Sequence, residues 1–334
     1  MIEWVRAGSG GRSQRHLPDA ANEPSATPRR SAAARALRLT FALAIALTGS
    51  VGQAASAALQ FCDTATARSA AEQDRLLRFA AIAKRELEGS GHAVALVARS
   101  GLNLQRFGIR YSHAGISLKA SDATPWSVRQ LYFACDEGRP RLYDQGLAGF
   151  VSGTDDPRLG YLSIVLLPPE RAAELERAAL DKARALRLQA ARYSANSYVY
   201  GLRYQNCNQW VAELIASAWG GIAEGAELRA QSQTWLAERG YSPEPVPVNS
   251  HALMFAAAFV PWLHSDDHPE DDRYALRFRT SLPASIETFV RAQAPGAERI
   301  ELCYGESGIV VRRGWVPIDD GCSPQAGDRV VPLD

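Results

Sequence analysis

The stretch "RYQNCNQWVAELIASAWG" (203–220) decides the fold, because it joins a polar loop to an amphipathic helix at a cysteine. After Cys207 the apolar residues recur at three- and four-residue steps, as one buried helix face requires. Asn206 suits the N-cap position, since its side-chain oxygen can accept hydrogen bonds from the free N–H groups of the first turn. The stretch therefore predicts a helix that begins at Cys207.

This position suggests a chemical role for Cys207. A thiol in the first turn of a helix lies at the positive end of the helix dipole, which lowers its pKa and favours the thiolate. The alternative is the ordinary role of a free cysteine, that of a small buried apolar side chain. A nucleophilic role requires a base from elsewhere in the chain.

The first 57 of the 334 residues differ from the rest. Residues 1–34 are rich in Gly, Ser, Pro, Ala and Arg, and basic residues then precede the apolar run "LTFALAIALTGSVG" (39–52) and the small residues "QAASAA" (53–58). This order predicts a disordered leader and a secretory signal peptide, cleaved near Ala57. An uncleaved anchor helix is the alternative, although the run is shorter than the ~20 residues that span a membrane. We expect a periplasmic or secreted protein that meets the membrane only through an uncleaved signal segment.

Charge and motifs exclude several classes of function. Residues 1–57 hold seven of the 37 basic and three of the 36 acidic residues, so the remainder carries a net charge of −3. A nucleic-acid-binding protein would instead present a basic surface. The chain has no glycine-rich phosphate loop, CxxC pair or HExxH motif, and we expect no cofactor. The loop "HSDDHPEDD" (264–272) could bind a metal through His264 and His268, but we expect it to be a solvated acidic loop and predict no metal site.

All five cysteines lie after the predicted signal peptide. In an oxidising compartment four can pair and one is left over. Cys303 and Cys322 are close in sequence, and their bridge would close a loop of about 20 residues. Cys62 and Cys135 would then form the second pair and leave Cys207 free. Four cysteines allow three connectivities, so this pairing is a hypothesis.

The mature chain mixes helical and strand patterns. We expect helices at 68–88, 169–190 and 226–240, strands at 93–99, 109–118, 128–136 and 161–168, and mainly β-structure with turns from 274 to 334. The order predicts an α+β fold in which an antiparallel sheet packs on helices. The proline-rich stretch "YSPEPVPVN" (241–249) suggests a boundary between a main domain (58–245) and a β-rich C-terminal extension (246–334).

The base is expected to be His113. Of the five histidines after residue 57, it alone lies inside a clear strand, "IRYSHAGISL" (109–118). Gly115 follows on the same face and leaves room beside the ring. The alternative is an imidazole that is hydrogen-bonded within the sheet and has no catalytic role.

The motifs "SHAGI" (112–116) on a strand and "NCNQW" (206–210) at a helix start resemble the circularly permuted papain-like superfamily, over roughly residues 92–220. This group includes permuted NlpC/P60 proteins, the lecithin:retinol acyltransferase group and PPPDE peptidases. In ordinary papain-like enzymes the cysteine precedes the histidine, and permutation reverses that order. More closely, "QDRLLRFA", "RYSHAGISL", "PWSVRQLYFACDE", "RLYDQGLAGF" and "RYQNCNQWVAEL" resemble the exported bacterial family called domain of unknown function 2145.

The superfamily resemblance implies roles for individual residues. Cys207 matches the nucleophile and His113 the base. If the strands 109–118 and 128–136 pair as a hairpin, Gln130 and Tyr132 lie opposite Gly115 and His113, and Gln130 could orient the imidazole. Asp144 is the reserve candidate for that role.

The oxyanion would be bound by backbone N–H groups at the helix start, near Asn206, Cys207 and Asn208. The implied activity is hydrolysis of an amide, ester or thioester, with peptide, glycopeptide or acyl substrates; cell-wall peptides are one candidate. The alternatives are acyl transfer, which an apolar groove at Trp210 and Trp219 would favour, and a non-catalytic cell-envelope module that binds a peptide or glycan.

Overall fold

The computed structural model describes residues 68–306 and 308–333. The predicted leader, the signal peptide and Cys62 lie outside these residues. One eight-stranded sheet organises the described chain, in the order β10-β9-β8-β5-β1-β2-β3-β4, with every neighbouring pair antiparallel. Its strands are β1 (Val94–Arg99), β2 (His113–Leu118), β3 (Ser127–Ala134), β4 (Arg139–Gln145), β5 (Gly160–Leu166), β8 (Glu298–Gly305), β9 (Gly308–Arg313) and β10 (Arg329–Val331).

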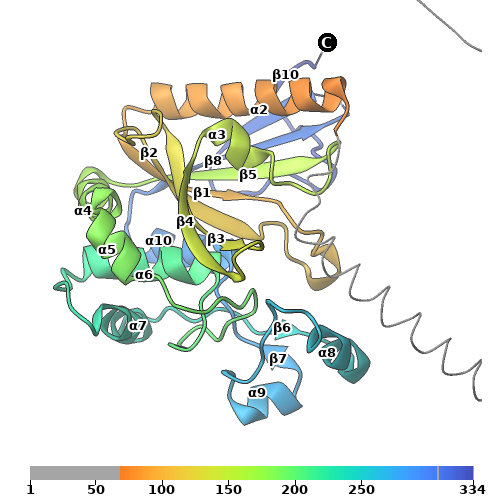
Figure 1. Ribbon diagram of the computed structural model, residues 1–334. Coiled ribbons are helices and arrows are strands. Elements are labelled where there is room, and N and C mark those ends of the chain that lie inside the picture. Colours follow the sequence, from red (N-terminus) through yellow and green to blue (C-terminus); the bar gives the residue numbers. More distant parts are fainter. Residues whose placement is uncertain (1–67, 307, 334) are drawn as a thin grey trace, which may run out of the picture. The chain divides into compact units, whose positions relative to one another are not determined.

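Helices surround the sheet, and a two-stranded sheet of β6 (Val246–Pro247) and β7 (Arg277–Phe278) lies apart from it (Figure 1). The α-helices of the described residues are α2 (Ala70–Gly89), α3 (Leu147–Val151), α4 (Pro169–Leu180), α5 (Lys182–Arg187), α6 (Cys207–Trp219), α7 (Leu228–Glu238), α8 (His251–Ala257), α9 (Glu270–Tyr274) and α10 (Pro283–Gln293). The predicted mixed α+β class with an antiparallel sheet packed on helices is confirmed.

Each face of the sheet has its own apolar core. The side chains of α2 and α3 pack on one face with Val97 and Val128 of the sheet. The side chains of α4, α6 and α10 pack on the opposite face with Leu96 and Ile116. The central strands β1, β2 and β5 are buried along their whole length, as expected for a sheet covered on both faces.

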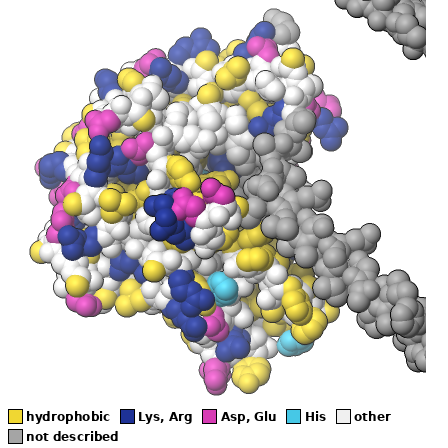
Figure 2. Space-filling view, viewed as in Figure 1, with side chains coloured by type: hydrophobic (Ala, Val, Ile, Leu, Met, Phe, Trp, Pro, Cys, Tyr) yellow, Lys and Arg dark blue, Asp and Glu magenta, His cyan; other side chains and the backbone are white. Residues whose placement is uncertain are grey.

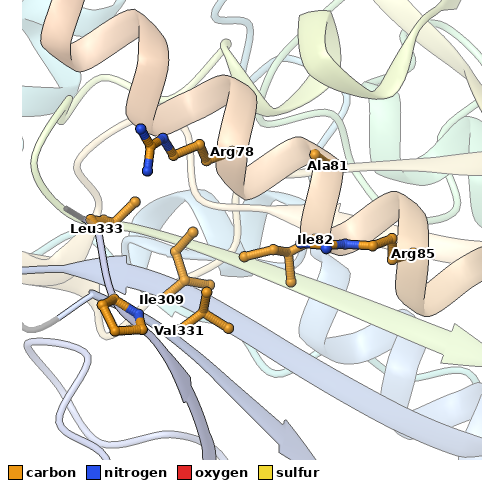
Figure 3. Close-up of a pocket in the computed structure, with 8 residues that line it drawn as sticks. Arg78, Ala81, Ile82, Arg85, Ile309, Val331 and Leu333 are labelled. Atoms are coloured by element: carbon orange, nitrogen blue, oxygen red, sulfur yellow. The ribbon is translucent and has the colours of Figure 1, made fainter.

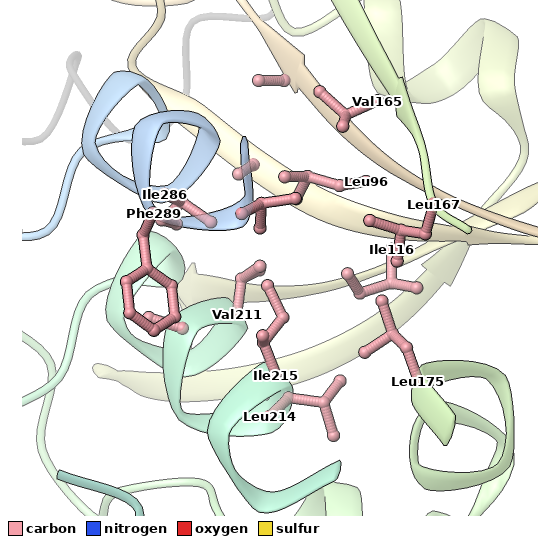
Figure 4. Packing of buried hydrophobic residues seen from close by; sticks show 14 of the residues in the cluster. Leu96, Ile116, Val165, Leu167, Leu175, Val211, Leu214, Ile215, Ile286 and Phe289 are labelled. Atoms are coloured by element: carbon pink, nitrogen blue, oxygen red, sulfur yellow. The ribbon is translucent and has the colours of Figure 1, made fainter. Parts of the chain in front are cut away.

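The helix predicted to begin at Cys207 is confirmed. Asn206 is its N-cap, and the side-chain oxygen accepts a hydrogen bond from the backbone N–H of Gln209 at 2.7 Å. The predicted apolar positions Val211, Leu214 and Ile215 are buried. Val211 and Ile215 point to the sheet, and Leu214 points toward Leu175 of α4 (Pro169–Leu180) (Figure 4). Burial of this face aligns the helix with β2 and brings its first turn to the beginning of that strand.

The sequence interpretation differs from the structure at two places. The helix predicted over 169–190 is two helices, because Asp181 has an extended backbone and its side chain caps α5 at the N–H of Arg184. The C-terminal region, expected to be mainly β, contains α10, in which Ile286, Phe289 and Val290 face the core. Strands from both sides of residue 245 share the large sheet, since β8 pairs with β5.

The disulfide predicted between Cys303 and Cys322 is confirmed, and it closes a loop with a sequence separation of 19 residues. Cys135 is also disulfide-bonded. Among the described cysteines Cys207 is the free one, and it is buried. A disulfide is compatible with the expected location outside the cytoplasm. Within residues 68–306 and 308–333, no helix combines the length and apolarity needed to span a membrane.

Candidate active site

The first turn of α6 is held by side-chain amides. The Nδ2 atom of Asn206 donates to the carbonyl of Ala195 at 3.1 Å and to the hydroxyl of Thr280 at 2.9 Å. The Nδ2 atom of Asn208 donates to the carbonyls of Ser112 and Ser281, each at 3.1 Å. Since Ser112 directly precedes His113, the Asn208 amide ties the start of the Cys207 helix to the start of the His113 strand.

A buried carboxylate supports the same helix one turn further on. Glu213 is fully buried and forms a two-pronged ion pair with Arg229, with N–O distances of 2.9 and 3.0 Å. Its oxygens also accept from the side-chain amides of Gln205, Gln209 and Gln233. Five N–H donors therefore converge on one carboxylate and connect α6 to α7 and to the loop before Cys207.

His113 lies at the beginning of β2, as predicted, and Gln130 contacts it. The pairing of Ile116 with Arg129 continues the predicted register, in which Gly115 lies opposite Gln130. The Nε2 atom of His113 and the Oε1 atom of Gln130 are 2.5 Å apart. The Nε2 atom of Gln130 donates to Gln145 at 2.7 Å, so its carbonyl oxygen faces the ring.

This contact assigns the tautomer of His113. An amide oxygen only accepts hydrogen bonds, so Nε2 of the imidazole must carry the proton. The lone pair available to a reaction is then on Nδ1. Gln145 accepts a hydrogen bond from the Gln130 amide and so orients it, just as Gln130 orients the His113 ring. The sequence pattern did not point to Gln145.

The sulfur of Cys207 approaches β2 where β2 separates from β3. The N–H of Lys119, just after β2, donates to the carbonyl of Ala93, just before β1. Because N–H groups alternate in direction along a strand, the N–H of Ala114 points toward β3. The ladder between β2 and β3 begins only at Ile116. The N–H groups of Asn208 and Ala114 instead lie near the Cys207 sulfur, where they favour the thiolate. The hydroxyl of Tyr193 also lies near this sulfur.

The expected lowering of the thiol pKa is wrong. Burial raises the pKa of Cys207 to about 11, although Arg99 and the N–H groups of Asn208 and Ala114 favour the thiolate. Only 5% of the residue is exposed, so loss of water outweighs the favourable position at the helix start. Burial, with a smaller contribution from Arg99, also lowers the pKa of His113 to about 3. Thiol and imidazole are therefore both neutral near pH 7.

Several residues considered from the sequence lie elsewhere. Asp144 forms a two-pronged ion pair with Arg129, at 2.7 and 2.6 Å, and does not orient His113. Trp210 and Trp219 are buried in the core, and their indole N–H groups bond to backbone carbonyls, so they line no groove.

The histidines of the acidic loop are used locally. His264 stacks on Tyr204, and His268 bonds to the carbonyl of Asn196. In the part of the chain that the structure describes, no group of three or more His, Cys, Asp or Glu residues is placed to hold a metal ion.

Two surface features lie apart from this site. An apolar depression lies between α2 and the β9–β10 edge, with Ile82 facing Ile309 and Val331 (Figure 3). Apolar side chains also gather on the surface over α8 (Figure 2), where Phe255 and Phe259 are each 70% exposed. None of these residues contacts Cys207 or His113.

Comparison with known proteins gives one match. A family model described as an uncharacterized protein conserved in bacteria (DUF2145) matches residues 86–290. No curated protein and no solved structure matches the chain.

Proposed function

The chain belongs to the DUF2145 family of bacterial proteins, and we propose that it is a thiol-dependent hydrolase with Cys207 as nucleophile and His113 as base. The observation that carries this proposal is the connection of α6 to β2 directly beside His113, at the end of β2 where the ladder with β3 has not yet begun, although His113 pairs with Arg99 and so points to the sheet face opposite α6. The Asn208 amide bonds to the carbonyl of Ser112, which precedes His113, and the N–H of Ala114, which follows His113, favours the thiolate of Cys207. The order of the two motifs and the amide partner of the histidine support a permuted papain-like core.

The proposed reaction begins from the neutral thiol. The sulfur adds to the acyl carbon of an amide, ester or thioester while Nδ1 of His113 accepts the thiol proton. The carbonyl electron pair moves onto oxygen, which accepts hydrogen bonds from the N–H groups of Cys207, Asn208 and Ala114, the groups that also favour negative charge on the sulfur. When the intermediate collapses, the imidazolium returns its proton to the leaving amine, alcohol or thiol.

The second half of the reaction releases the acyl group. Water gives a proton to Nδ1 of His113 and adds to the thioester carbon. The carbon–sulfur bond then breaks, the sulfur takes back its proton, and a carboxylic acid leaves. Gln130 keeps Nδ1 directed at the reacting atoms in both halves, because its oxygen holds the opposite ring nitrogen.

A non-catalytic binding module is the second candidate. The raised pKa of Cys207 and the lowered pKa of His113 favour it, since an active thiol is usually a thiolate in a partly exposed, electropositive environment. Acyl transfer is the third candidate, and burial of Trp210 and Trp219 removes the groove that would have favoured it.

Turnover of a small ester distinguishes these functions. We expect the full chain to release more than one equivalent of nitrophenolate from p-nitrophenyl acetate, with an acetyl group found on Cys207 by intact mass. Cys207→Ala should abolish the release. Release that stops at one equivalent unless an amine acceptor is added would indicate acyl transfer. Release equal to that from Cys207→Ala would indicate the binding module and contradict the proposal.

A further inference from the structure

Arg99 is a buried cation that forms no ion pair with a carboxylate of the described residues. It ends β1, pairs directly with His113 in the ladder, and is 6% exposed. Among the described residues no carboxylate oxygen lies within ion-pair distance of its guanidinium. Its Nη1 atom donates to two backbone carbonyls, those of Ser100 and Gly153. A buried charge is costly unless an opposite charge or a ligand balances it.

Two glycines make room for this side chain. A Cβ atom at Gly101 would lie 2.7 Å from Nη1, and one at Gly153 would lie 2.2 Å from Nη2. The ring of Phe150 contacts both the guanidinium, at 5.4 Å from its centroid, and the imidazole of His113, at 5.9 Å between centroids. Arg99 and His113 therefore share one face of the sheet and one aromatic neighbour.

One edge of the guanidinium has unused donors. Among the described residues the Nε atom is buried without a hydrogen-bond partner, and the hydrogen bonds that the guanidinium makes to them come from Nη1. The N–H groups of Nε and Nη2 point the same way and form the fork that a carboxylate accepts with both oxygens. Besides burial, which lowers the pKa of Arg99, the groups that act on it are Tyr132, Cys207 and Asp155, which favour the charged guanidinium, and Arg68, which disfavours it.

We propose that Arg99 recognises a carboxylate of the substrate, through Nε and Nη2, beside the bond that Cys207 attacks. This inference rests on the proposed function and narrows its substrates to acyl compounds that carry a carboxylate near the scissile bond. A planar carboxylate fits the two parallel N–H groups of the fork. The solvent-facing neighbour is Tyr132, which is 46% exposed and contacts His113 with ring centroids 5.7 Å apart.

Alkylation of Cys207 by iodoacetate and by iodoacetamide tests the proposal. In both reactions sulfur displaces iodide from the same carbon, and only iodoacetate carries a carboxylate. We expect the iodoacetate-to-iodoacetamide rate ratio of the full chain to exceed that of free cysteine by about tenfold, since charge-assisted hydrogen bonds are strong. Arg99→Gln should return the ratio to that of free cysteine. The exposed Arg106→Gln is the matched control and should keep the wild-type ratio.

If Arg99→Gln does not fold, the proposal can still be tested on the wild-type chain by adding a free carboxylate that competes for the site. Propionate should slow iodoacetamide alkylation of wild-type Cys207 at fixed ionic strength, whereas propionamide should not. Equal protection by phosphate, no protection by propionate, or a ratio that Arg99→Gln leaves unchanged would overturn the proposal. Alkylation of Cys207 does not require catalytic turnover. If the ratio depends on Arg99 but the chain does not hydrolyse the ester, the proposed hydrolase function fails and the carboxylate site stands. If the chain hydrolyses the ester but the ratio does not depend on Arg99, only the carboxylate site fails.

Discussion

Replacement of His113 with Ala is expected to slow acylation of Cys207 by p-nitrophenyl acetate at least 100-fold at pH 8. With a thiol pKa of about 11, only about one sulfur in a thousand is ionised at that pH, so the reaction depends on proton removal during attack. A positioned base contributes roughly 10²–10⁴-fold to such a step. The rate of acetyl transfer to Cys207, followed by intact mass, measures the effect.

Two further variants show whether the loss of rate is specific to the His113 imidazole. Gln130→Ala retains the imidazole but loses the oxygen that fixes its tautomer, and we expect a decrease of roughly tenfold. His251→Ala removes an exposed histidine of α8 and should leave the rate unchanged. If His113→Ala and His251→Ala acylate at the same rate, His113 is not the base.

Glu213→Ala is expected to destabilise the fold by about 3–5 kcal/mol, because it leaves a largely buried guanidinium without its carboxylate. The side chain of Arg229 is only 11% exposed and would lose both arms of its ion pair. The amides of Gln205, Gln209 and Gln233 would lose an acceptor at the same time. The free energy of unfolding, from urea titration followed by circular dichroism, measures this loss.

The control for this variant is Glu238→Ala, which removes an exposed carboxylate at the end of α7 and should change stability by less than about 0.5 kcal/mol. Adding Arg229→Met to Glu213→Ala should recover part of the loss, since it removes the unpaired buried charge. A loss below about 1 kcal/mol for Glu213→Ala would mean that water or neighbouring groups satisfy Arg229 without the carboxylate.

Local sequence pattern predicted the parts of the candidate site that depend on short-range rules. The start of α6 at Cys207 follows from an N-cap residue and an apolar period. The contact between His113 and Gln130 follows from strand alternation and a short hairpin, which place Gly115 opposite Gln130. Both features depend on residues that are close together in sequence.

Features that depend on tertiary packing were missed. The thiol pKa was expected to fall because the helix start was considered without the burial that surrounds it. Arg99 was not considered as a site residue, although its direct pairing with His113 places the two on one face of the sheet. The helix α10 was missed because its apolar residues face a core built largely from the other half of the chain.

The pH dependence of Cys207 acylation, compared between the wild-type chain and His113→Ala, tests the proposed thiol–imidazole pair most directly. With a His113 pKa of about 3 and a Cys207 pKa of about 11, we expect a wild-type rate that is nearly constant from about pH 4 to 10, where neutral thiol and neutral base coexist. His113→Ala should react only through the thiolate, so its rate should rise about tenfold per pH unit over the same range. Two superimposable profiles, each rising with pH, would contradict the account.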